Sequence, residues 1–97
     1  MSRLYRFDLK IRSAQLPAKE EALEAATAAL WPFDSWDVEP DGQYWGTGQG
    51  SFSGHEAPFA EKLDAAVRAV LGADAKVEVI ATDLDSAPEA HYRFDPK

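Results

Sequence analysis

The chain has 97 residues, no cysteine and a formal net charge of −7, from 17 acidic and 10 basic side chains. The length suits one packed domain over residues 1–97, and the lack of cysteine excludes a disulfide framework, thiolate metal sites and cysteine nucleophiles. The acidity opposes direct contact with nucleic acid or with an anionic membrane surface, because such surfaces would repel the chain on average.

The first expected element is a β-strand over residues 4–12. Its odd positions carry Tyr5, Phe7, Leu9 and Ile11, and its even positions from 6 to 12 carry only charged side chains. This alternation is typical of a strand buried on one side. The segment also lacks the continuous apolar stretch of a signal peptide or a membrane span, so we expect a cytoplasmic protein.

A first helix is expected over residues 17–30. Pro17 suits a first helical turn, and Leu23 and Leu30 recur with helical spacing. Pro32 then ends the helix because it cannot continue the hydrogen-bond ladder.

A β-hairpin follows, with strands expected over residues 36–40 and 43–52 around the turn Pro40-Asp41-Gly42. In the second strand, alternation separates two sets of side chains. One set is Tyr44, Gly46, Gly48, Gly50 and Phe52, and the other is Trp45, Thr47, Gln49 and Ser51. The glycines weaken the strand prediction, and they indicate either close packing of a helix or a bulge.

The second helix is expected over residues 58–71, and a further strand over residues 76–82. The order β-α-β-β-α-β predicts an α+β, ferredoxin-like domain with an antiparallel four-stranded sheet and both helices on one face. At the C-terminus, Tyr92 and Phe94 alternate with polar residues, which permits either a short fifth strand at a sheet edge or a frayed tail. The expected core consists of Tyr5, Phe7, Leu9, Leu23, Leu30, Val38, Phe59, Leu63, Val67, Val70, Val77 and Val79.

Trp45 is the main candidate for a binding residue. The alternation places it away from the helices, where an exposed tryptophan among polar groups is a plausible contact anchor. The side chains expected beside it are Thr47, Gln49, Arg6 and Lys10. The arrangement resembles RNA-recognition sheets, but the first strand offers charged residues instead of an aromatic there, so no nucleic-acid site is expected.

The segment 46–56 offers a second candidate, a pocket with Gly48, Gly50, His55 and Glu56. A strand, a glycine loop and a helix N-terminus in succession can bind phosphate. However, the spacing matches neither G-x-G-x-x-G nor a Walker sequence. The interpretation favoured for the two histidines is that of solvated surface side chains, and no metal or cofactor is expected.

These patterns favour a small acidic module that binds another protein, a basic one in particular, over an enzyme. It would act through an open sheet face and acidic loops. Small immunity proteins, antitoxins and inhibitors of defence nucleases share this size and acidity. A homodimer is compatible with the same pattern, and the alternative function is a small enzyme or ligand-binding domain with its pocket near residues 46–56.

Overall fold

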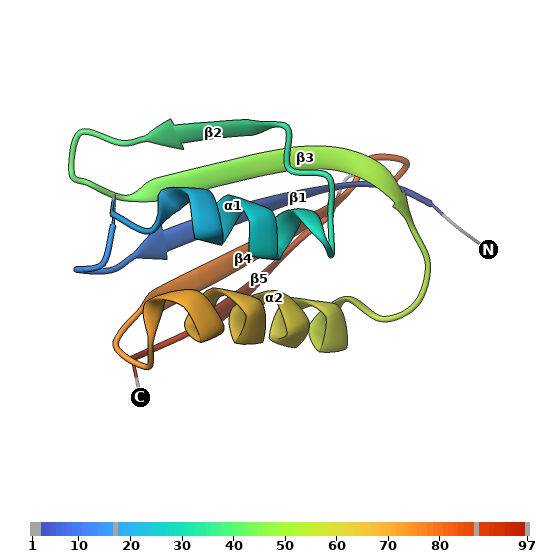
Figure 1. The fold of residues 1–97 in the computed structure, drawn as a ribbon. Coiled ribbons are helices and arrows are strands. Elements are labelled where there is room, and N and C mark those ends of the chain that lie inside the picture. Colours follow the sequence, from blue (N-terminus) through green and yellow to red (C-terminus); the bar gives the residue numbers. More distant parts are fainter. Residues whose placement is uncertain (1–2, 17, 87, 97) are drawn as a thin grey trace.

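Two helices cover one face of a five-stranded antiparallel sheet (Figure 1). The computed structural model describes residues 3–16, 18–86 and 88–96. The elements are β1 (Arg3–Arg12), α1 (Glu20–Ala28), β2 (Ser35–Val38), β3 (Tyr44–Phe52), α2 (Glu56–Leu71), β4 (Lys76–Asp83) and β5 (Glu89–Phe94). The predicted α+β class and the predicted order of the first six elements are therefore confirmed.

The strand order is β2-β3-β1-β4-β5. β1 is central and pairs with β3 and β4, so the first strand of the chain organises the whole sheet. The C-terminal segment forms a fifth strand that pairs with β4 from Val77↔Phe94 to Thr82↔Glu89. The main prediction of four strands was thus one strand short, and the open choice at the C-terminus is decided in favour of a strand.

The helix boundaries differ from the predicted ones in opposite directions. α1 begins at Glu20 rather than at residue 17, and Pro17 lies outside the described residues. α2 begins two residues before Pro58, so this proline occupies the first turn, where its missing N–H costs no hydrogen bond. Neither helix of the described chain is long and apolar enough to cross a membrane.

The core lies between the sheet and the two helices. Phe7, Leu9 and Ile11 of β1 are fully buried, as the alternation predicted. Phe7 also contacts Trp31 and Phe59 edge to face, with ring centroids 4.7 and 5.0 Å away. Aromatic rings in this geometry attract one another in addition to their hydrophobic burial.

Val38 was wrongly placed in the predicted core, because its exposed fraction is 60%. It lies on β2, the outermost strand on its side of the sheet, beside the hairpin turn. An edge strand has no neighbouring strand on its outer side, so the side chains there are left exposed to solvent. Leu30, Phe59 and Val70 are only partly buried, and they pack against the core from its border.

The glycines of β3 accommodate the chain segment that follows α1. A Cβ atom on Gly48 would lie 2.1 Å from the carbonyl oxygen of Pro32, and one on Gly46 would lie 2.8 Å from the Trp36 ring. β3 pairs with β1 without interruption, so no bulge is present in this ladder. The predicted reason for the glycines, close packing, is therefore right, but a loop and a tryptophan take the place of the expected helix.

Candidate functional site

The sheet face opposite the helices, here called the open face, is covered by no described helix (Figure 1). Alternation along the strands brings mostly charged and polar side chains to it. They are Arg6, Asp8, Lys10 and Arg12 of β1, Asp37 of β2, Trp45, Thr47 and Gln49 of β3, Lys76, Glu78 and Thr82 of β4, and Glu89, His91 and Arg93 of β5, together with the apolar Ile80 of β4. All five residues of the predicted Trp45 surface thus lie on this face, on the adjacent strands β1 and β3.

Asp8 lies at the centre of the open face and is only 6% exposed. Its Oδ1 atom accepts a hydrogen bond from Nε1 of Trp45 at 3.2 Å, and its Oδ2 atom lies 3.4 Å from Nε of Arg6. A buried carboxylate needs such partners, because leaving it unpaired away from water is costly. Asp8 therefore ties Arg6 and Trp45 together across two strands.

Trp45 is half-buried rather than substantially exposed, which corrects the expectation from the sequence. Its strand phase was predicted correctly, but its ring lies against its neighbours. Nζ of Lys10, the residue directly opposite in β1, lies 4.8 Å from the ring centroid. An ammonium group over an indole ring is attracted by the ring's negative face. Asp8 and Lys10 together fix the orientation of the indole.

Beside the indole the open face is hollowed over about 480 Å³, and we call this the Trp45 hollow. Its lining consists of Arg6, Asp8, Asp34, Trp45, Thr47, Gly48 and Gln49. Four of the five predicted binding residues line the Trp45 hollow. The fifth, Lys10, does not line it but contacts the Trp45 ring. The sequence analysis missed Asp8 and Asp34. The alternation of β1 had already placed Asp8 on this face, but nothing in the sequence showed that it would be buried.

Two polar atoms in the lining have no hydrogen-bond partner among the described residues. They are Nε of Arg6 and Oγ1 of Thr47. Oγ1 of Thr82, directly opposite Arg6 on β4, is also without one. Buried polar atoms are usually paired, so this part of the open face has unused hydrogen-bonding capacity close to Asp8.

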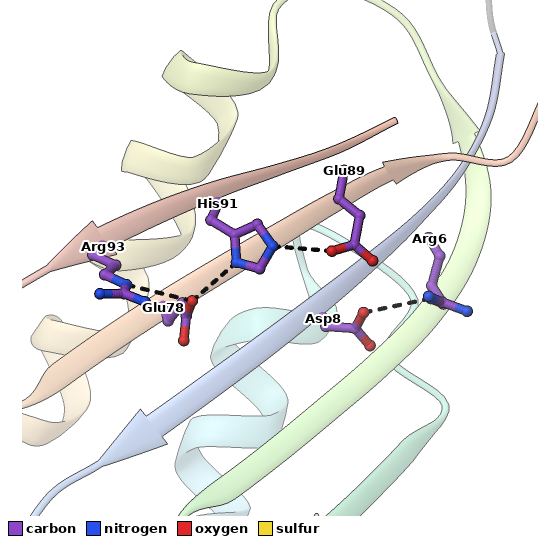
Figure 2. A network of polar contacts seen from close by, with 6 residues as sticks. All are labelled: Arg6, Asp8, Glu78, Glu89, His91 and Arg93. Carbon is purple, nitrogen blue, oxygen red and sulfur yellow. Dashed lines mark hydrogen bonds and ion pairs between the residues drawn. The ribbon is translucent and has the colours of Figure 1, made fainter. Parts of the chain in front are cut away.

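A second polar cluster lies on β4 and β5, where Figure 2 shows its side chains on the same side of the sheet as Arg6 and Asp8. Nδ1 of His91 lies 3.2 Å from Oε2 of Glu78, and Nε2 of His91 lies 3.0 Å from Oε1 of Glu89. These two contacts raise the pKa of His91. Arg93 lies 3.6 Å from the same oxygen of Glu78. His91 is exposed, in agreement with the predicted solvated side chain, but its carboxylate contacts were not predicted, because they form only when β5 pairs with β4.

The alternative pocket residues are dispersed. His55 is exposed at the N-terminal end of α2 and borders a hollow of about 370 Å³ with Glu56, Tyr5 and Tyr92. Glu56 already accepts hydrogen bonds from Tyr5 Oη at 2.6 Å and from Tyr92 Oη at 3.0 Å. Both oxygens of the Glu56 carboxylate, which the sequence suggested as a pocket residue, thus already accept hydrogen bonds from tyrosines.

The two glycines considered with His55 lie elsewhere on β3. Gly48 lies against Pro32, and Gly50 lies against the Trp31 ring. Their close contacts are with the chain after α1, so they do not form a phosphate-binding loop at the start of α2. Within the described ranges, no three or more His, Asp or Glu side chains are arranged to hold a metal ion.

Comparison of the chain with models of protein families, with curated proteins and with solved structures found no significant match to any of them.

Proposed function

We propose that this chain is a small, non-enzymatic binding module, of the inhibitor or immunity type, that contacts another protein through its open face. One observation carries the proposal: Trp45 is held in a fixed orientation on an uncovered sheet face, by Asp8 on one side and Lys10 on the other. Tryptophans in such positions are the side chains that most often dominate the energy of an interface.

The preorganisation of Trp45 supports this proposal. A side chain that is already ordered in the free protein loses little conformational entropy on binding. The Trp45 hollow offers a recess beside the ring, and the polar residues around it match the polar rim that surrounds an aromatic anchor in known interfaces. The open face thus combines an anchor, a recess and a rim.

The acidic loops contribute less to this surface than the sequence suggested. Asp83 is 3% exposed and accepts a hydrogen bond from Arg3 at 2.9 Å. Asp41 is paired with Arg12. Asp34 and Asp37 remain exposed on the β2 side, where Asp37 lies opposite Trp45 in register. A basic group of the partner would meet the open face there.

We also propose a ferredoxin-like core for the fold, made of β1 to β4 with α1 and α2, and extended at one edge by β5. The strand order β2-β3-β1-β4 within the larger sheet supports it. Cytoplasmic location stays a prediction.

Site-specific photocrosslinking in the native host tests the proposed contact. A photoreactive residue at Gln49 would report the open face, and one at Ala65, which is exposed on α2, would serve as the matched control. We expect a defined protein adduct from position 49 that is absent from position 65 and is weakened by Trp45→Ala. The same adducts from both positions would contradict the proposal. An adduct of twice the chain mass would also contradict it and would indicate that the open face contacts a second copy of the chain.

A further inference from the structure

The basic side chains of this acidic chain are unevenly distributed. Of the nine Lys and Arg residues that the structure describes, five lie on the open face, and four of these gather at the end where β1 and β5 finish and β4 begins. The four are Lys10, Arg12, Lys76 and Arg93, and they line a hollow of about 350 Å³, which we call the basic hollow.

Among the described residues that line the basic hollow, two carry carboxylates, Glu78 and Asp95. The described lining therefore carries two more positive than negative charges, and still one more when Asp41, which pairs with Arg12, is counted, in a chain whose net charge is −7. Such a local surplus creates a positive potential that attracts anionic groups even when the whole protein is acidic.

Among the described residues, no carboxylate pairs with the lysines of the basic hollow. Lys76 is exposed and forms no ion pair with another described residue. Lys10 points its ammonium group at the Trp45 ring instead of at a carboxylate. Glu78 responds to this environment: burial would raise its pKa, but the hydrogen bond to His91 and the charges of Arg93 and Lys10 outweigh burial and lower it.

We propose that the basic hollow receives an aspartate or glutamate side chain from an acidic segment of the protein partner. The inference rests on the proposed function, since it takes the open face as the contact surface. The hollow is large enough to admit a carboxylate side chain, and Arg and Lys pair with carboxylates through charge-assisted hydrogen bonds. Because Lys10 borders both the basic hollow and Trp45, the partner would place an acidic residue next to the group that contacts the indole.

A nucleic acid fits this surface less well. Its phosphates repeat along the strand, so a bound strand leaving the basic hollow would cross the open face near Asp37 or Glu89. These carboxylates would repel the following phosphates. A single acidic side chain occupies the hollow without meeting them.

The test is an NMR titration at low salt with a blocked hexaglutamate peptide as the probe. We expect shifts that concentrate at Lys10, Lys76, Arg93 and the indole N–H of Trp45. Lys76→Gln should weaken binding roughly three- to fivefold, the effect of one partly screened charge contact. Lys62→Gln on the exposed side of α2 removes the same charge elsewhere and should leave the affinity unchanged.

Three results would overturn the inference: shifts scattered over the lysines of the helices, equal weakening by both lysine variants, or tighter binding of hexathymidylate than of hexaglutamate at the same residues. These results are separable from the crosslinking experiment. If the Gln49 adduct persists while hexaglutamate ignores the basic hollow, only the acidic contact is refuted. If hexaglutamate binds there and no Gln49 adduct forms, the basic hollow binds carboxylates but the proposed function fails.

Discussion

Trp31 and Gly48 are joined by a buried hydrogen bond, in which Nε1 of the indole donates to the glycine carbonyl oxygen at 2.9 Å. The bond fastens the chain after α1 onto β3. It forms because Gly48 has no side chain: the Pro32 carbonyl occupies the space that a Cβ atom would need. The alternating glycines of β3 thus make room for the chain that follows α1, from Trp31 to Trp36.

Gly48→Ala should destabilise the protein by about 3 kcal/mol, because the added carbon would displace the Pro32 backbone and strain the Trp31 hydrogen bond. Gly50→Ala is the graded control, since its Cβ would lie 3.3 Å from the Trp31 ring and needs only a small adjustment. Urea unfolding of the two variants measures the difference. Equal stability of Gly48→Ala and the unchanged chain would contradict this account of the glycines.

The sequence predicted local structure well wherever one periodicity dominated. The alternation of β1 placed Phe7 and Leu9 in the core and Asp8 on the other face. It could not predict that Asp8 would be buried, because that burial depends on Trp45, a residue 37 positions away. Long-range pairing, and not the local pattern, decides such a contact.

The same limit explains what the sequence missed at the sheet edges. Val38 alternates like a core residue, yet it lies on a short outer strand that has no described strand beyond it. His91 is exposed, as the sequence predicted, but its contacts with Glu78 and Glu89 could not be predicted, because the two carboxylates approach it through the β4–β5 pairing. The exposure and the contacts of a residue at a sheet edge depend on which strands lie beside it, and the alternation within one strand does not predict those neighbours.

Arg68→Met should cost about 3 kcal/mol, because it would leave the carboxylate of Asp64 unpaired in a buried position. Nε of Arg68 donates to Oδ1 of Asp64 at 2.8 Å, and both side chains are at most 10% exposed. The guanidinium also donates to the carbonyl oxygens of Ala73, Phe94 and Asp95, which ties α2 to the end of β5.

Chemical unfolding of Arg68→Met beside Arg93→Met tests this role, since Arg93 is 74% exposed and its loss should change stability by no more than about 0.5 kcal/mol. Adding Asp64→Leu to Arg68→Met should restore part of the lost stability, because no buried charge remains. A double variant that is less stable than Arg68→Met would contradict the explanation.

Tyr5 should make the protein sensitive to alkali. Its hydrogen bond to Glu56, aided by burial, raises the pKa of Tyr5 to about 12. The unfolded chain loses this proton near pH 10, at about the ordinary value for tyrosine. The stabilisation is therefore complete below about pH 10 and is lost as the pH rises toward 12.

The free energy of unfolding should accordingly fall between pH 10 and 12, and fall less steeply in Tyr5→Phe, which cannot ionise there. A residual slope is expected in that variant, because the hydrogen bond to Glu20 and burial also raise the pKa of Tyr44 to about 12. Urea titrations across this pH range provide the measurement. Identical slopes for both proteins would exclude a role for Tyr5.

His91 should titrate above its ordinary pKa of about 6.5, because Glu78 and Glu89 both stabilise its protonated form. A raised histidine pKa contributes stability that is complete below the unfolded value and is lost as the pH rises through the folded value. NMR titration of the imidazole protons measures the pKa directly. Glu78→Gln should lower it, whereas Glu61→Gln, the same charge change on exposed α2, should leave it in place.

Trp45→Ala should separate the structural role of the indole from its binding role. Because Trp45 is half-buried and donates to Asp8, its removal should cost about 1–2 kcal/mol of stability, more than for a freely exposed side chain. The variant should still fold, and it should weaken the complex captured through Gln49 by about 2 kcal/mol or more, the scale of an interface anchor. Trp45→Phe keeps the aromatic ring but loses the N–H donor, so it should recover most of the binding while the Asp8 hydrogen bond stays absent. Thermal melts and a binding titration of both variants decide the matter: full stability in Trp45→Ala would contradict the Asp8 contact, and unchanged binding would remove Trp45 from the interface.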